Sequence, residues 1–128
     1  MPKEIVRTDT APTPIGPYSQ GVRAGNLFFV AGQGCMNPAT GQMARESVES
    51  ETRQVLENVK AILGAAGLSL GQVVKTTCYL ADMNDFQAFN AVYATYFAEQ
   101  PPARTTIQAA RLPGDIKVEV EAIALIDD

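Results

Sequence analysis

The sequence predicts an α+β domain in which a single mixed β-sheet carries two helices packed on one face. Apolar residues recur at helical spacing over about residues 47–66 and 82–99, and the segments around them alternate or run apolar as β-strands do. The order is strands, helix, strand, helix and two strands, which is typical of an α+β fold. The length of 128 residues suits a single domain spanning residues 1–128.

Composition narrows the classes of function. The formal net charge is −4 without a cluster of lysine and arginine, which argues against a nucleic-acid partner. The chain has no histidine, and its two cysteines, Cys35 and Cys78, are too few for a structural zinc site, so we expect free thiols in the core and no metal. No stretch resembles a signal peptide or a membrane span. These features indicate a soluble, cytoplasmic protein with no membrane partner.

The first third of the chain is expected to be extended. The prolines between Pro12 and Pro17 prevent a helix. Val22-Arg23 and Leu27–Ala31 then predict two strands that form a hairpin around Gly25-Asn26. On these residues alone, Tyr18 is either a surface ring or part of a site.

Residues 47–66 predict the first helix. Ser47 or Ser50 can cap its start, and Gly67 ends it. We expect its buried face to pack in the core and to carry no chemistry. That face consists of Val55, Leu56, Val59, Ile62, Leu63 and Ala66.

A strand and a second helix follow. Val73–Leu80 is nearly continuously apolar or β-branched, which predicts an interior strand. Residues 82–85 offer several caps for a helix that runs to about Glu99. Asn90 lies on or beside its apolar face, where an unpaired amide costs on the order of 1–3 kcal/mol. The amide therefore bonds either a loop or a ligand. The apolar positions are Phe86, Phe89, Tyr93, Tyr96 and Phe97.

The last strand, from about Val118 to Ile126, places apolar residues on one face, which we expect the helices to cover. The other face carries Glu119 and Glu121 and then Ile123 and Leu125. Because a solvent-facing strand does not need the last two, we infer that another subunit, or else a loop, covers this face.

Arg104 and Glu119 are the best chemical pair in the chain. Arg104 begins a strand and shares a polar stripe with Thr106 and Gln108. In a plain hairpin turned at Pro113-Gly114, Arg104 and Glu119 would be offset by about four residues, on the order of 13 Å. Either the two strands are not direct partners, or more than one chain assembles the site.

An ordered set of motifs, spaced correctly from about residue 4 to the C-terminus, resembles the RidA (YjgF) family of reactive-intermediate imine deaminases. The motifs are Gly16-Pro17-Tyr18-Ser19-Gln20, Gly32-Gln33, Asn37-Pro38-x-Thr40-Gly41, Asn58-Val59-Lys60-Ala61-Ile62, Val74-Lys75-Thr76-Thr77, Pro102-Ala103-Arg104 and Val118-Glu119-Val120-Glu121-Ala122-Ile123-Ala124.

The resemblance implies a chorismate-mutase-like homotrimer with ligand sites in the clefts between subunits. It implies hydrolysis of 2-imino or enamine acids, such as 2-aminoacrylate, to 2-oxo acids and ammonia without a cofactor. Arg104 would bind the substrate carboxylate as a planar fork, and Glu119 would handle the attacking water. Tyr18 and Asn90 would line the pocket.

Two positions depart from the best-known form of the family. Ala31 stands where that form has a serine, and Thr106 stands where it has a cysteine. Both are expected to line the substrate site, so both bear on substrate preference and rate. These two departures also leave open a non-catalytic hypothesis, in which the clefts bind or sense small 2-oxo acids. A third hypothesis is an RNA-cleaving activity that inhibits translation. The negative net charge of the chain argues against it.

Overall fold

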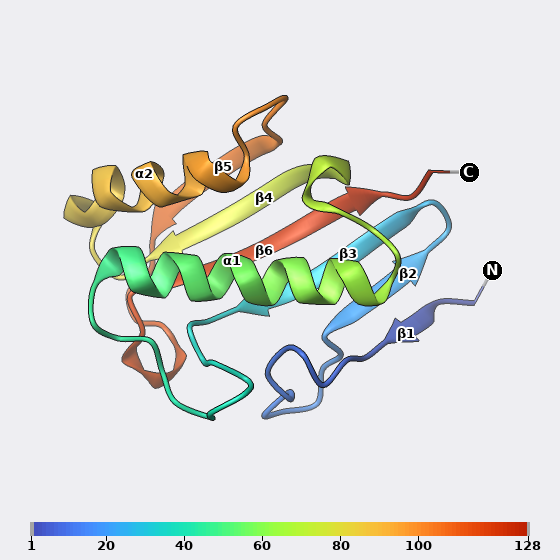
Figure 1. Cartoon of the computed structure of the whole chain (residues 1–128), viewed down its shortest axis with the longest axis horizontal. Coiled ribbons are helices and arrows are strands. Elements are labelled where there is room, and N and C mark those ends of the chain that lie inside the picture. Colours follow the sequence, from blue (N-terminus) through green and yellow to red (C-terminus); the bar gives the residue numbers. More distant parts are fainter. Residues whose placement is uncertain (1, 128) are drawn as a thin grey trace.

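A computed structural model describes residues 2–127 of the chain. Within them, six strands form one mixed sheet in the order β1-β2-β3-β6-β4-β5, and two α-helices lie across one face of it (Figure 1). The predicted fold class is confirmed. The strands are β1 (Glu4–Val6), β2 (Gly21–Ala24), β3 (Leu27–Gln33), β4 (Val73–Leu80), β5 (Ala103–Gln108) and β6 (Val118–Leu125), and the helices are α1 (Val48–Ala65) and α2 (Phe86–Tyr96). Short 3₁₀ helices at Leu70–Gln72, Met83–Asp85 and Pro113–Asp115 precede β4, α2 and β6.

Helix α1 begins and ends where the sequence predicts. The Ser47 side chain accepts a hydrogen bond from the backbone N–H of Ser50, and the Ser50 hydroxyl accepts one from Ser47, each at 3.0 Å. Gly67, at φ 75°, follows the end of the helix. The buried face is less uniform than expected, since Glu51 and Asn58 are buried among its apolar residues.

The amino-terminal strands are antiparallel. β2 and β3 form the predicted hairpin, with Ala24 opposite Leu27. β1 pairs with β2, although the sequence did not predict this strand. Three residues are too few to show the alternation that identifies a strand.

The last two strands do not form the plain hairpin that was considered for them. β5 runs parallel to β4, with Arg104 beside Thr76, whereas β6 lies between β3 and β4. β4, α2 and β5 therefore form a parallel crossover unit, and β4 is interior, as predicted. Of the two alternatives that the register left open, the first holds: the strands of Arg104 and Glu119 are not direct partners.

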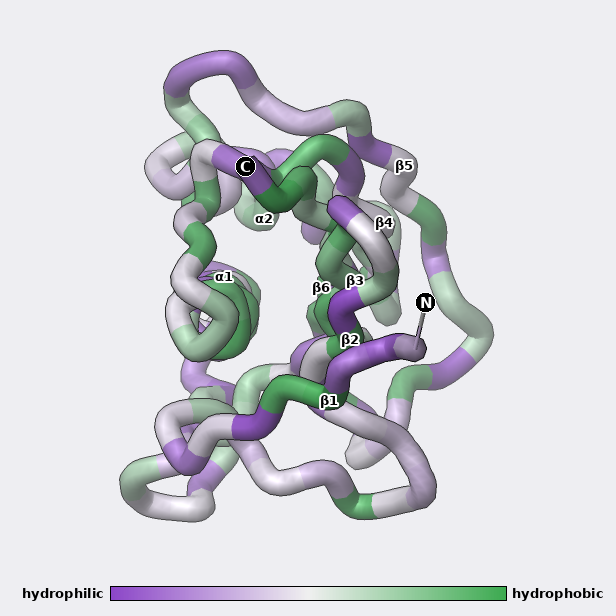
Figure 2. Tube along the Cα trace, turned by 90° about the vertical axis from the view of Figure 1, so that its right-hand side faces the viewer, coloured by the Kyte–Doolittle hydropathy of each residue, from purple (hydrophilic) through white to green (hydrophobic). Residues whose placement is uncertain are grey.

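The two faces of the sheet differ in burial. In the side view, α1 forms one layer and the strands of the sheet form a second layer beside it (Figure 2). On β6, the residues from Val118 to Ala124 that face the helices are buried, as predicted. Large apolar side chains stay exposed on the opposite face, among them Phe29 at 39% and Leu125 at 40%. Cys35 and Cys78 are buried free thiols, as expected. No helix within residues 2–127 has the length and hydropathy needed to cross a membrane.

Candidate functional site

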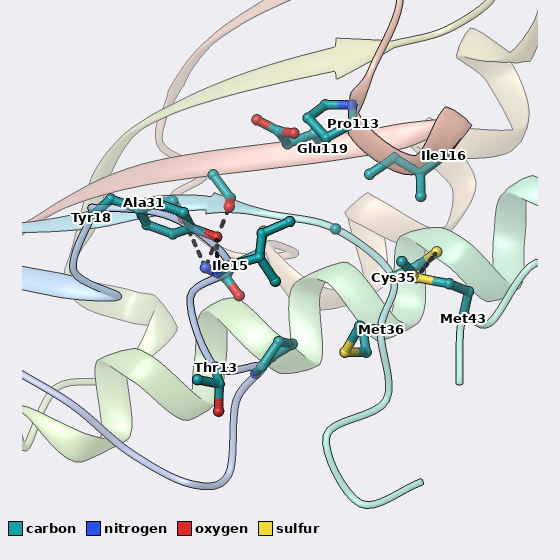
Figure 3. Close-up of a pocket in the computed structure, with 14 residues that line it drawn as sticks. Thr13, Ile15, Tyr18, Ala31, Cys35, Met36, Met43, Pro113, Ile116 and Glu119 are labelled. Carbon is teal, nitrogen blue, oxygen red and sulfur yellow. Dashed lines mark hydrogen bonds between the residues drawn. The ribbon is translucent and has the colours of Figure 1, made fainter. Parts of the chain in front are cut away.

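A cavity of about 400 Å³ lies at the carboxyl end of β3 (Figure 3). Its walls come from segments far apart in the sequence: the proline-rich loop at 12–18, residues 31–36, Met43, and residues 113–119. Tyr18, Ala31 and Glu119, three residues singled out in the sequence, all line it. We call these three the cavity group.

A bulge in β3 shapes the wall next to Glu119. Val30 lies opposite Ala122 and Gln33 opposite Val120, so β3 has one more residue than β6 over this stretch. Gly32 lies inside the bulge, and a Cβ built on it would clash with the Glu119 carboxylate and lie 3.0 Å from its carboxyl carbon. Glycine at this position therefore leaves the space that the Glu119 carboxylate occupies.

The two glutamates of β6 can now be told apart. Tyr79 Oη donates to Glu121 Oε1 at 2.7 Å. Within residues 2–127, no hydrogen bond or ion pair engages the Glu119 carboxylate, which faces the cavity. Burial and the nearby charge of Glu121 raise the pKa of Glu119 above its usual value. A carboxyl group that is free and easily protonated can accept and return a proton.

Arg104 lies elsewhere, at the edge of the sheet beneath α2. Its guanidinium carbon is 4.7 Å from the ring centroid of Tyr93, 5.5 Å from that of Phe86 and 5.6 Å from that of Phe89. The polar stripe of β5 thus faces the helix side of the sheet. Ion pairs within residues 2–127 join Arg111 to Asp115 and Lys117 to Glu51, but none involves Arg104.

Within residues 2–127, two polar atoms, one on β5 and one on the helix α2 that packs over Arg104, are buried without hydrogen-bond partners. They are Oδ1 of Asn90 and Oγ1 of Thr106. Native proteins rarely leave buried polar atoms unpaired, because each costs about 1–3 kcal/mol. We call Asn90, Arg104 and Thr106 the edge group; within residues 2–127 it has hydrogen-bonding capacity that the chain itself does not use.

One chain does not bring the two groups together. Arg104 is level with Thr76, whose hydroxyl lies 2.7 Å from Tyr93 Oη under α2. Glu119 is level with Tyr79 on the other face of the sheet. The two charged residues are also separated by two strand spacings, about 10 Å, and by about 10 Å along the strands.

Buried polar side chains that the sequence analysis passed over hold the cavity walls. Asn58 Nδ2 donates to the carbonyl oxygens of Gly34 at 3.0 Å and Met36 at 2.9 Å. Glu51, which has no exposed surface, accepts the backbone N–H of Lys117 at 2.8 Å and so fixes the approach to β6. The sequence pattern could have indicated these two residues, because both are polar residues beside the apolar face of a helix.

Gln20 holds the proline-rich loop in the same way. Its Nε2 donates to the carbonyl oxygens of Thr8 at 3.0 Å and Pro12 at 2.9 Å, and its Oε1 accepts the N–H of Thr8 at 2.8 Å. One buried amide therefore ties the loop carrying Tyr18 to β2.

Comparisons with known proteins agree with one another. The model of the family described as endoribonuclease L-PSP matches residues 8–126. A RutC family protein of Pyrococcus horikoshii is 55% identical over 95% of this chain and 97% of its own length. The 2-iminobutanoate/2-iminopropanoate deaminase of Escherichia coli is 48% identical over 95% and 97% of the two chains. The crystal structure of Escherichia coli TdcF with bound serine superposes with a TM-score of 0.93 at 45% identity, covering 97% of this chain and 99% of the other.

Proposed function

The chain belongs to the RidA (YjgF) family, and from this premise we propose that it hydrolyses 2-imino and enamine acids to 2-oxo acids and ammonia. The observation that carries the proposal is Glu119, whose half-buried carboxyl group has a raised pKa, faces the cavity and has no hydrogen-bond or ion-pair partner within residues 2–127. Such a group is suited to proton transfer. The activity named for the Escherichia coli relative supports this substrate class.

The proposed site takes its parts from two subunits. Arg104 of one chain binds the substrate carboxylate with two parallel hydrogen bonds, and Asn90 and Thr106 supply the polar atoms beside it. Glu119 of the neighbouring chain faces the imine carbon. A homotrimer that covers the exposed apolar side chains of the sheet, such as Phe29 and Leu125, would bring the two groups together.

The chemistry then follows from one carboxylate and one water. An enamine substrate first gains a proton on its β-carbon, loses one from its nitrogen and so becomes the imine. Glu119 accepts a proton from water as the water oxygen adds to the imine carbon. The same carboxyl group returns that proton to the nitrogen, which gives a carbinolamine. It then moves the hydroxyl proton of the carbinolamine to the amino group as the carbon–nitrogen bond breaks, so that ammonia leaves with the 2-oxo acid. The step consumes one water and needs no cofactor.

The test couples the purified protein to a dehydratase that releases the enamine of threonine. The protein should accelerate formation of 2-oxobutanoate and ammonia beyond the rate in buffer. Arg104→Ala should lower kcat/KM on the order of 100-fold, because two charge-assisted hydrogen bonds are lost. Arg53→Ala, an exposed arginine on α1, is the matched control and should behave as the wild type. Equal rates with and without the wild-type protein would rule the activity out.

A second candidate is binding of 2-oxo acids without turnover. Ala31 favours it, because this wall of the cavity carries a methyl group and no hydroxyl. Calorimetric titration with 2-oxobutanoate would then show saturable binding in a protein that fails to accelerate imine hydrolysis.

A further inference from the structure

Three aromatic rings of α2 lie around the guanidinium of Arg104, and the proposed chemistry gives them no part. Phe86, Phe89 and Tyr93, which we call the aromatic cluster, are spaced i, i+3 and i+7, so they share one face of the helix. α2 packs beside β4 and β5 (Figure 1), and the Tyr93 ring is the nearest of the three, with its centroid 4.7 Å from the guanidinium carbon.

Tyr93 differs from the two phenylalanines because its ring is attached to the sheet as well as to the helix. Its hydroxyl oxygen is hydrogen-bonded to that of Thr76 at 2.7 Å, and both residues are buried. Thr76 is the residue of β4 that lies directly beside Arg104 in the parallel ladder. Along the helix, the ring centroids of Phe89 and Phe97 lie 5.5 Å and 4.7 Å from that of Tyr93 and limit its sideways movement. The ring is therefore held from both ends and from both sides.

The aromatic cluster can hold a guanidinium without neutralising it. The face of an aromatic ring attracts a cation through its quadrupole, whereas a carboxylate in the same place would compete with the carboxylate of a substrate. Within residues 2–127, no ion pair involves Arg104. Burial raises the pKa of Tyr93, so its hydroxyl stays neutral and adds no negative charge beside the arginine. Among the described residues, the cluster thus orients the cation and leaves its charge uncompensated.

We infer that Tyr93 is a positioning residue for Arg104: its ring, fixed by the hydrogen bond with Thr76, holds the guanidinium plane in the orientation that binds the substrate carboxylate. The inference rests on the proposed function, in which Arg104 binds that carboxylate. A planar guanidinium donates two parallel hydrogen bonds to a carboxylate only in a narrow range of orientations. Holding the long arginine side chain before the substrate arrives lowers the entropy lost on binding.

The first test replaces the ring. Tyr93→Leu keeps an apolar side chain in the core but removes the aromatic face, so KM for 2-iminobutanoate and Kd for 2-oxobutanoate, measured by calorimetry, should each rise about tenfold. The contact with the carboxylate is the same in the bound substrate and in the transition state. The loss should therefore appear in KM, with kcat changed by less than about twofold.

The second test removes only the hydrogen bond that fixes the ring. Tyr93→Phe and Thr76→Val each break it and keep the shape of the side chain, so each should raise KM and Kd by about threefold. The double variant should do no more than either single one, because the same bond is lost. Tyr96→Phe is the matched control, since this tyrosine of α2 donates its hydroxyl to Glu57 of α1 at 2.7 Å and not to the sheet. It should leave both constants unchanged.

A combination with Arg104→Ala separates positioning from a general effect on the fold. If Tyr93 acts through Arg104, Tyr93→Leu should not lower kcat/KM further in a chain that already carries Arg104→Ala. A purely structural role would lower kcat/KM by the same factor in both backgrounds, and that result would overturn the inference.

The fates of the two proposals can be told apart. If the wild type neither hydrolyses the imine nor binds 2-oxobutanoate, the proposed function fails and the inference fails with it. If it binds 2-oxobutanoate without turnover, the proposed function fails and the Kd values alone decide the inference. If the wild type is active and Tyr93→Leu keeps its KM, the reaction stands and the inference is overturned. Should Tyr93→Leu not fold, wild-type constants in both Tyr93→Phe and Thr76→Val would overturn it instead.

Discussion

The cavity group and the edge group differ in what surrounds their charged members. Glu119 faces open space, with a glycine on the adjacent strand making room for its carboxylate. Arg104 lies over three aromatic rings, next along β5 to a hydroxyl without a partner. Neither charge is neutralised within residues 2–127. This difference supports our proposal of two complementary half-sites, in which Glu119 transfers protons and Arg104 holds an anion.

The largest effect on kcat/KM is expected from substitutions that each disable one of the two half-sites. Glu119→Gln and Arg104→Ala should each lower kcat/KM by about 100-fold or more, because each removes one half of the proposed site. If the halves come from neighbouring subunits, unfolding the two variants together and refolding them as mixed oligomers should restore about one quarter of the wild-type activity, since that fraction of sites receives an intact residue from each chain.

The double variant is the control for this mixing experiment. A chain carrying both Glu119→Gln and Arg104→Ala, refolded with either single variant, should restore nothing. Mixed single variants that stay inactive, while size-exclusion chromatography shows the mixed oligomer, would contradict a site shared between subunits.

A smaller effect is expected from closing the space beside Glu119. In Gly32→Ala the new Cβ would clash with the Glu119 carboxylate, so the side chain must turn away from its place in the cavity. We expect kcat/KM to fall about tenfold or more, since displacement of a catalytic group by about 1 Å is enough for such a loss. Gly71→Ala, whose Cβ would have 3.7 Å to its nearest neighbour, is the control. Full activity of Gly32→Ala would show that Glu119 does not act from this position.

Local patterns predicted the elements well and their partners poorly. The helical stripe and its caps located α1, and alternation assigned the residues of β6 to the correct faces. Alternation identifies a face but not the neighbouring strand, so the parallel pairing of β5 with β4 could not be read from it. That pairing depends on where α2 crosses the sheet, which is a property of the whole fold.

The candidate site divides in the same way. Arg104 and Glu119 stood out by charge in apolar or strand context, and resemblance to the family gave them roles, which stay predictions. The cavity itself could not be derived from spacing, because four separate segments form its walls. The space that Gly32 leaves likewise appears only when β6 is in place beside it.

The smallest expected effect concerns pH and distinguishes Glu119 from its neighbour. Burial and then the Glu121 charge raise the pKa of Glu119, while the hydrogen bond to Glu121 raises the pKa of Tyr79 to about 12, which keeps Tyr79 neutral. Glu121→Gln removes the second cause and leaves the first, so the pKa of Glu119 should fall part of the way toward its ordinary value.

The pH profile of kcat/KM measures that change. Because Glu119 must be ionised to accept the proton of water, activity rises as pH passes its pKa, and in Glu121→Gln this acid limb should move to lower pH. Glu99→Gln, at an exposed position after α2, removes an equal charge away from the cavity and should leave the limb in place. A limb that stays in place in Glu121→Gln would mean that some group other than Glu119 sets it. Its movement would instead tie the acid limb to Glu119 in the cavity group.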